Sequence, residues 1–177
     1  MSEPTSSITE EPGATGALSN TVDGSDLRST MARFPTGVTI TTTLDRDGAP
    51  WGFTAGSLVS VSLDPPLISV CVAFGARCYP AFAESGTFTV NVLRHDRAEL
   101  ARTFASKGVD KFAAAGFTRS ATGMRLDEGT VAVLGCEVHG RHPAGDHLIL
   151  VGLVRELERS SDDQLLFADQ RFSRLAR

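Results

Sequence analysis

The sequence predicts a mainly β protein, built as a β-barrel with a few short helices appended. Several short segments alternate apolar and polar residues, which is the pattern of a half-buried strand. Clusters of Gly, Pro and Asp separate these segments and provide turn signals between them. Only two or three segments show helical spacing instead. The 177 residues contain no internal repeat and no sign of a second domain.

Composition indicates a folded protein and argues against two classes of partner. The chain is 41% hydrophobic and 21% charged, close to the globular average. A net charge of -4, without runs of Lys and Arg among aromatic residues, predicts no nucleic-acid partner. Apolar runs such as residues 67–74 are too short to span a bilayer, so no membrane partner is expected.

Two further features favour a cytoplasmic protein. The first residues lack the basic and apolar regions of a secretory signal, so export by that route is not expected. The three cysteines are odd in number, have no C-x-x-C spacing, and in two cases lie in apolar runs. Buried, reduced thiols are therefore predicted.

The N-terminal residues differ in composition from the rest of the chain. Residues 1–24 are rich in Ser, Thr, Glu, Pro and Gly, so we expect a disordered tail before a domain over residues 25–177. Apolar residues then recur at helical spacing over residues 27–34. This predicts a short helix with Ser25 as its cap, ended by Pro35.

Strand signals begin directly afterwards. Residues 37–44 alternate β-branched apolar residues with threonine, and residues 45–48 form a hairpin turn signal. The central stretch 51–74 is expected to start as a strand, loosen into a turn at 54–57, break at 64–66 and resume as an apolar strand. The later expected elements are a helix at 80–84, a strand at 87–93, a helix capped by Asp96 with Glu99, a turn at 106–108, and long strands at 131–141 and 147–158 around a turn at 143–146.

The central stretch is also the first candidate site. Small hydroxylated residues lie between two apolar strands, where the backbone can approach a ligand and hydroxyls can donate hydrogen bonds. This arrangement suits an anionic group such as the phosphate of FMN. Dinucleotide-binding G-x-G-x-x-G, P-loop and G-x-S-x-G motifs are missing. His139 and His142 would face opposite sides of a strand, so no metal site is predicted with His147.

Six motifs occur in one order across the chain. They are Phe34-Pro35-Thr36-Gly37-Val38-Thr39, Gly52-Phe53-Thr54-Ala55-Gly56-Ser57, Ser60-Val61-Ser62-Leu63-Asp64-Pro65-Pro66-Leu67, Asn91-Val92-Leu93, Phe104-Ala105-Ser106 with Asp110-Lys111-Phe112, and Gly145-Asp146-His147. Over about residues 27–172 the sequence resembles the short-chain flavin reductases, which are the reductase components of two-component flavin-dependent monooxygenases.

The resemblance implies a fold, an activity and partners. The expected fold is the FMN-binding split β-barrel, usually a homodimer with flavin near the subunit interface. The expected enzyme is an NAD(P)H-dependent flavin reductase that uses FMN or FAD with NADH or NADPH and supplies reduced flavin to a partner monooxygenase. Because hydride would pass directly from nicotinamide C4 to flavin N5, no catalytic side chain is predicted and catalysis rests on positioning.

The resemblance also assigns site residues. The expected ring contacts are Thr36, Gly37 and Val38, with Thr54, Ala55, Gly56 and Ser57 around the ring and ribityl chain. The candidates for the phosphate end are Ser60, Arg77, Ser106 and Lys107, and Ala76 and Phe112 are further flavin-binding candidates. Gly145, Asp146 and His147 match a motif associated with nicotinamide dinucleotides, in which His147 would orient the nicotinamide. The sequence departs from the family at Gly56, often Ser or Asn, and over residues 74–77.

Each assignment has a simpler alternative. Residues 54–57 could be only a turn, and Arg77 and Lys107 could be solvated surface charges. Phe112 could belong to the core, and Gly145-Asp146 is a hairpin turn in its own right. The joint occurrence of the motifs favours the reductase. A tight FMN-binding electron carrier without NADH turnover is the alternative function, and a split-barrel oxidase is disfavoured by the Gly-Asp-His motif.

Overall fold

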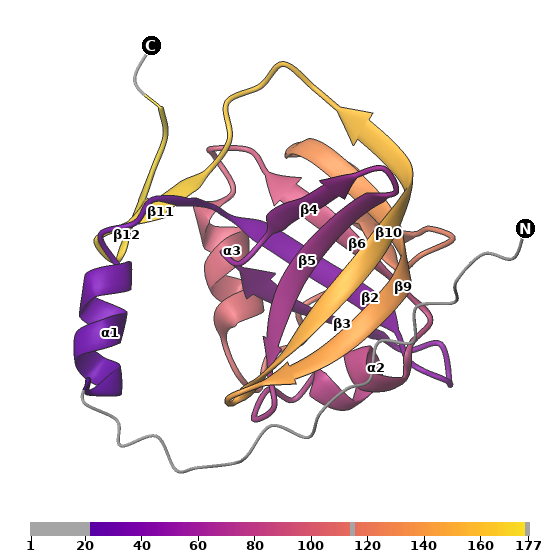
Figure 1. The fold of residues 1–177 in the computed structure, drawn as a ribbon. Helices are drawn as coiled ribbons and strands as arrows, with labels where there is room; N and C mark the ends of the chain where they lie inside the picture. Colours follow the sequence, from indigo (N-terminus) through magenta and orange to yellow (C-terminus); the bar gives the residue numbers. More distant parts are fainter. Residues whose placement is uncertain (1–21, 114–115, 176–177) are drawn as a thin grey trace, which may run out of the picture.

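A seven-stranded antiparallel sheet forms the centre of the structure, a computed structural model that describes residues 22–113 and 116–175. Its strand order is β3-β2-β6-β9-β10-β5-β4. The strands are β2 (Thr39–Leu44), β3 (Pro50–Ala55), β4 (Val59–Leu63), β5 (Pro66–Ala73), β6 (Thr87–Leu93), β9 (Thr130–Ala144) and β10 (His147–Arg159). Figure 1 shows the sheet strongly twisted and curved, with the helices outside it. The predicted mainly β barrel with short helices is confirmed.

The smaller elements lie around this sheet. The helices are α1 (Gly24–Met31), α2 (Tyr79–Glu84) and α3 (Ala98–Ala105). Two small sheets are formed by β1 (Thr36–Gly37), β11 (Leu166–Ala168) and β12 (Arg171–Ser173), and by β7 (Phe117–Arg119) with β8 (Met124–Leu126). None of the helices described for residues 22–113 and 116–175 is long and apolar enough to cross a membrane.

Two apolar clusters make up the core. The first fills the inside of the curved sheet, where the alternate residues Ile68, Val70 and Val72 of β5 meet Phe82 of α2 and Phe88 of β6. Strand alternation explains this cluster, because every second side chain of β5 points to the buried face. The second cluster joins α3 to the barrel, and its buried members are Val38, Ile40, Leu93, Ala101, Phe104, Leu126 and Leu165.

A C-terminal segment holds β1 in place. Thr36 and Gly37 pair with Phe167 and Leu166 of β11. Next to them, the Val38 amide donates to the Leu165 carbonyl at 3.0 Å. The first residues predicted for the flavin ring are therefore positioned by strand pairing with a segment far away in the sequence.

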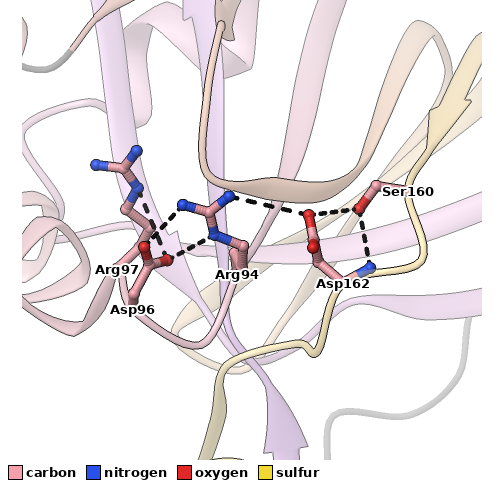
Figure 2. Close-up of polar contacts among 5 residues, drawn as sticks. All are labelled: Arg94, Asp96, Arg97, Ser160 and Asp162. Atoms are coloured by element: carbon pink, nitrogen blue, oxygen red, sulfur yellow. Dashed lines mark hydrogen bonds and ion pairs between the residues drawn. The ribbon is translucent and has the colours of Figure 1, made fainter.

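An ion-pair network anchors this segment to the barrel. Arg94 donates from Nε and Nη2 to both carboxylate oxygens of Asp96, at 2.9 and 2.8 Å. Its Nη1 lies 3.9 Å from the carboxylate of Asp162, which also accepts from the Ser160 hydroxyl. Figure 2 shows Arg94 between the two carboxylates, with Arg97 beside Asp96. Arg94 thus links the turn before α3 to the chain that leads into β11.

The helix termini differ from the sequence predictions. Asp23, not Ser25, caps α1: its carboxylate accepts from the Ser25 amide, and the helix ends at Met31, before Pro35. None of its residues is buried, and Figure 1 shows α1 apart from the barrel, beside β12. Helix α3 has Arg97 at its N-cap without a side-chain hydrogen bond, because the Asp96 carboxylate is paired with Arg94 instead.

Strand limits also differ at three places. The predicted strand 37–44 is divided at Val38, which belongs to neither β1 nor β2. Thr54 and Ala55 are the last residues of β3, so only Gly56 and Ser57 of the predicted turn follow the strand. Pro143 and Ala144 continue β9, which leaves Gly145 and Asp146 as the turn. Residues 1–21 of the predicted disordered tail lie outside the described residues, and Gly24 already begins α1.

Candidate functional site

A cavity of about 270 Å³ lies between β3, the loop from β5 to α2, and the loop that follows α3. Five of the residues predicted for flavin binding line it: Ala76, Arg77, Ser106, Lys107 and Phe112. The structure therefore brings together three segments that are remote in sequence.

Positive charge dominates the ionisable groups of the cavity. Arg77, Lys107 and Lys111 line it, and Asp110 is the one acidic residue among the lining residues that the structure describes. The Asp110 carboxylate accepts from the backbone amide of Phe112 at 3.1 Å, so it is engaged within its own turn. The cations Arg77 and Lys107 make the cavity suitable for an anionic ligand, since charge-assisted hydrogen bonds are the strong ones.

Lys111 was missed as a site residue by sequence reasoning. Its Nζ donates to the Phe104 carbonyl at 2.6 Å and to the Gly52 carbonyl at 3.3 Å. Burial lowers the pKa of the ammonium. Cys78 acts in the opposite direction, and the nearby charge of Arg77 lowers the pKa slightly further. The signal for Lys111 was the Asp-Lys-Phe motif, which was used only to identify the family.

Aromatic rings form another wall. The ring of Phe112 packs edge-to-face on Phe104, with centroids 5.1 Å apart, and both rings contact Phe117. A Cβ atom at Gly52 would lie 3.0 Å from Phe104 and 3.2 Å from Phe112, so the absence of a side chain allows this approach. Phe112 consequently lines the cavity and packs against the second core cluster at once.

Other lining residues were not predicted individually as site residues. Trp51 and Phe53 lie on β3, and Cys78 precedes α2. The Trp51 indole Nε1 donates to the Asp45 carboxylate at 2.7 Å, which fixes the ring's orientation. Burial raises the pKa of the Cys78 thiol, so it stays protonated at neutral pH. All three cysteines are free, as predicted; Cys78 and Cys136 are buried, whereas Cys71 is only half-buried.

The residues predicted for the ring form a second group, beside β1 and the end of β3. Gly56 lies against Thr36, because a Cβ atom at Gly56 would be 2.7 Å from the Thr36 hydroxyl oxygen and 3.9 Å from the Gly37 carbonyl. Ala55 pairs with Thr39 of β2. Val38 is buried in the core, so its side chain serves to hold Gly37.

Two hydroxyls of this group have partners within the protein. The Thr54 hydroxyl donates to the Ala101 carbonyl of α3 at 2.6 Å. The Ser57 hydroxyl accepts from the Cys71 amide at 2.9 Å, which leaves its proton available to a ligand. Thr54 therefore anchors the strand end, whereas Ser57 keeps a donor.

The Gly-Asp-His turn lies against the loop that leads into the cavity. The Asp146 carbonyl accepts from the Phe74 amide at 3.0 Å, and His147 is paired with Ala73. The His147 Nδ1 lies 2.7 Å from the Asp146 carboxylate, and this hydrogen bond lowers the pKa of Asp146. Asp146 thus orients the imidazole, and the strand partner of His147, Ala73, lies three residues before Ala76 in the sequence.

Ser60 is not brought to the cavity. It lies on the outermost strand β4, is exposed, and does not appear among the residues lining the cavity. Large apolar side chains surround it on the same strand: Val59 is 55%, Val61 52% and Leu63 89% exposed. Among the described residues, no group of three or more His, Cys, Asp or Glu side chains is arranged to hold a metal ion.

Comparison with known proteins gives one consistent result. Residues 31–176 match the sequence model of the flavin reductase like domain. The actinorhodin polyketide dimerase of Streptomyces coelicolor is 48% identical over 150 residues, 84% of this chain and 85% of that protein. The reductase subunit of a flavin-dependent monooxygenase from Rhodococcus jostii is 35% identical over 161 residues, 90% of this chain and 82% of that protein.

The fold gives the same assignment. An NADH:FAD oxidoreductase of Streptomyces globisporus, solved with NAD and FAD fragments, superposes with a TM-score of 0.82 at 36% identity, covering 87% of this chain and 93% of the other. With a domain match over most of the chain and relatives of this identity, the protein belongs to the flavin reductase family.

Proposed function

We propose that the cavity binds the phosphate end of a flavin, with the ring beside β1 and the end of β3. The protein is an NAD(P)H-dependent flavin reductase that supplies reduced flavin to a partner monooxygenase. The site assignment rests on one observation: the cations Arg77 and Lys107 line the same cavity. A phosphate group needs such donors, and the two loops that hold them line the same cavity as β3.

The ring region fits a flavin in a different way. Thr36, Gly37 and Gly56 leave little side-chain bulk, so a flat ring could approach the backbone. Bound flavin would supply the hydride acceptor, while backbone N–H groups near Ser57 would stabilise negative charge on the reduced ring. The protein's contribution is to hold the flavin ring and the nicotinamide ring in the geometry for hydride transfer, since no acid or base is needed.

The dinucleotide is proposed to meet the Gly-Asp-His turn. Asp146 orients the His147 imidazole, and the turn packs on the loop before Ala76. A nicotinamide dinucleotide at this turn would be next to a flavin whose phosphate lies at Arg77. The chain offers no separate Rossmann motif, which suits loose binding in a shared cleft.

We further propose a homodimer. Strand β4 is one of the two edge strands of the large sheet and exposes Val59, Val61 and Leu63, while α1 exposes Leu27 and Met31. Edge strands with apolar side chains are normally covered. The protein is expected to elute as a dimer in size-exclusion chromatography with light scattering, and Leu63→Asp should shift it toward monomer.

We also propose a cytoplasmic location, because free cysteines and the use of nicotinamide cofactors favour it.

A steady-state assay tests the proposed activity. Purified protein should consume NADH or NADPH only when FMN or FAD is added, with cytochrome c or oxygen as the final acceptor. Comparing both flavins and both nicotinamides on one preparation would identify the preferred pair. Flavin that survives dialysis on the protein without any nicotinamide turnover would instead support an electron carrier.

A further inference from the structure

The loop after α3 presents the predicted phosphate ligands but has few contacts of its own. Residues 106–110 are all exposed, and they include Ser106 and Lys107. The Ser106 hydroxyl donates to the Arg102 carbonyl of the preceding helix turn, and Asp110 bonds to its own turn. These local bonds do not attach the loop to the barrel. A contact outside residues 106–110 is therefore needed to attach this loop to the barrel.

Lys111 provides that attachment. One hydrogen bond reaches the Phe104 carbonyl at the end of α3, and the other reaches the Gly52 carbonyl on β3. Carbonyls in the last turn of a helix lack helical partners, and a cation there also complements the helix dipole. The ammonium therefore joins the helix end, the edge strand and the loop at one point.

The aromatic contacts make this point rigid. The Lys111 Nζ lies 5.9 Å from the centre of the Phe104 ring, and the next residue, Phe112, packs on the same ring. Both rings fill the space above Gly52. Lys111 is thus held by packing as well as by hydrogen bonds, and the residues just before it are held at a fixed distance from β3.

We propose that Lys111 is a positioning residue: it fixes the loop 106–110 as a wall of the cavity, so that Ser106 and Lys107 meet the flavin phosphate together with Arg77. This inference rests on the proposed flavin site. Lys111 acts on the phosphate through the loop, because its described hydrogen bonds go to backbone carbonyls of the protein itself.

Replacing the ammonium tests the idea kinetically. FMN and riboflavin differ only in the phosphate, so their KM ratio measures phosphate recognition. Lys111→Met should raise the KM for FMN roughly tenfold, the scale of one charge-assisted hydrogen bond, and leave the KM for riboflavin and for NADH near wild type. Lys111→Arg, which keeps a cationic donor, should restore much of the FMN preference. Arg159→Met, at the far end of β10 from the Gly-Asp-His turn, is the matched control and should behave as wild type.

A measurement without flavin separates positioning from direct contact. Amide hydrogen exchange over residues 106–113 should become faster in Lys111→Met, while exchange in β6 and β9 stays unchanged. Unchanged exchange over the loop would overturn the proposal, as would an equal rise in KM for FMN and riboflavin. If the wild-type protein had equal KM values for FMN and riboflavin, the phosphate site would be refuted. The hydrogen-exchange result would still test, independently, whether Lys111 anchors the loop.

Discussion

The hydroxyl of Thr54 donates a 2.6 Å hydrogen bond to the carbonyl of Ala101, and so ties the end of β3 to α3. The strand end carries Ala55 and Gly56 toward Thr36, while the helix leads into the loop of the cavity. One hydroxyl therefore connects the proposed ring region with the proposed phosphate region, although it was expected to contact the flavin directly.

Removing this hydroxyl should weaken both folding and flavin binding. Thr54→Val keeps the shape but loses the bond, and should lower the free energy of unfolding by about 1 kcal/mol. The KM for flavin should rise as the two regions lose their common anchor. Urea denaturation and steady-state kinetics measure the two effects. Thr54→Ser retains the hydroxyl and serves as the control; a Val variant with wild-type stability would contradict the anchoring role.

A side chain at Gly52 should be costly. The new methyl group in Gly52→Ala would lie 3.0 Å from Phe104 and 3.2 Å from the Thr41 carbonyl, so the aromatic rings or the strand must move. Overpacking of this kind costs about 1–3 kcal/mol, visible as a lower denaturation midpoint. Gly86→Ala meets no atom within 4 Å and is the matched control. Equal denaturation midpoints for the two variants would contradict this prediction, because they would show that the aromatic rings can move aside without a loss of stability.

His147→Ala should separate the two substrates. Because the imidazole lies at the turn proposed for the dinucleotide, the KM for NADH should rise by more than the KM for flavin. His142→Ala, an exposed histidine on the same hairpin, should leave both constants unchanged. A larger effect on flavin than on NADH would remove His147 from the dinucleotide site.

Acid should weaken the network around Arg94. Hydrogen bonds from Arg94 lower the pKa of Asp96 from 3.8 to about 2. Since the folded protein depresses this pKa, the associated stability is present above pH 4 and is lost as pH falls toward 2. Both side chains are partly exposed, so solvent screening reduces the contribution to the order of 1 kcal/mol.

Comparison of wild type with Asp96→Asn isolates this carboxylate from the other acidic groups. The variant should be less stable at pH 7, and the difference should shrink as urea denaturation is repeated at pH values down to 2. A difference that stays constant across this range would mean that protonation of Asp96 does not govern the network.

The strands that were predicted well are those whose pattern is local. Strand β5 alternates buried and half-buried side chains over most of its eight residues. The sequence of β6 alternates threonine or asparagine with apolar residues, although most of its side chains are buried. A single sequence reveals both patterns. Strands β7, β8, β11 and β12 are three residues long, so they carry too little periodicity to be recognised. Asp96 illustrates another limit. Its residue type favours capping a helix, but its carboxylate forms a bidentate ion pair with Arg94 instead.

The site was predictable only in part for a similar reason. Ser106 was predicted from its motif and Arg77 and Lys107 from the resemblance to the family, although residues 74–77 depart from the family pattern. The structure brings all three to one cavity. Trp51 and Cys78 line it because separate segments fold against each other, and nothing in their own neighbourhood indicates this. Lys111 lay within a known motif, but its role depends on two carbonyls that sequence alone cannot bring near it.

The pairing of β1 with β11 has a consequence for biosynthesis. Thr36 is made early in translation, yet the strand that holds it includes Phe167 and is made much later. A nascent chain still attached to the ribosome before that point would have its barrel strands, but the proposed ring site would lack the strand that positions Thr36. Flavin capture should therefore begin only after translation of the last strands, and fragments that stop short of Leu165 would be unable to retain the ligand.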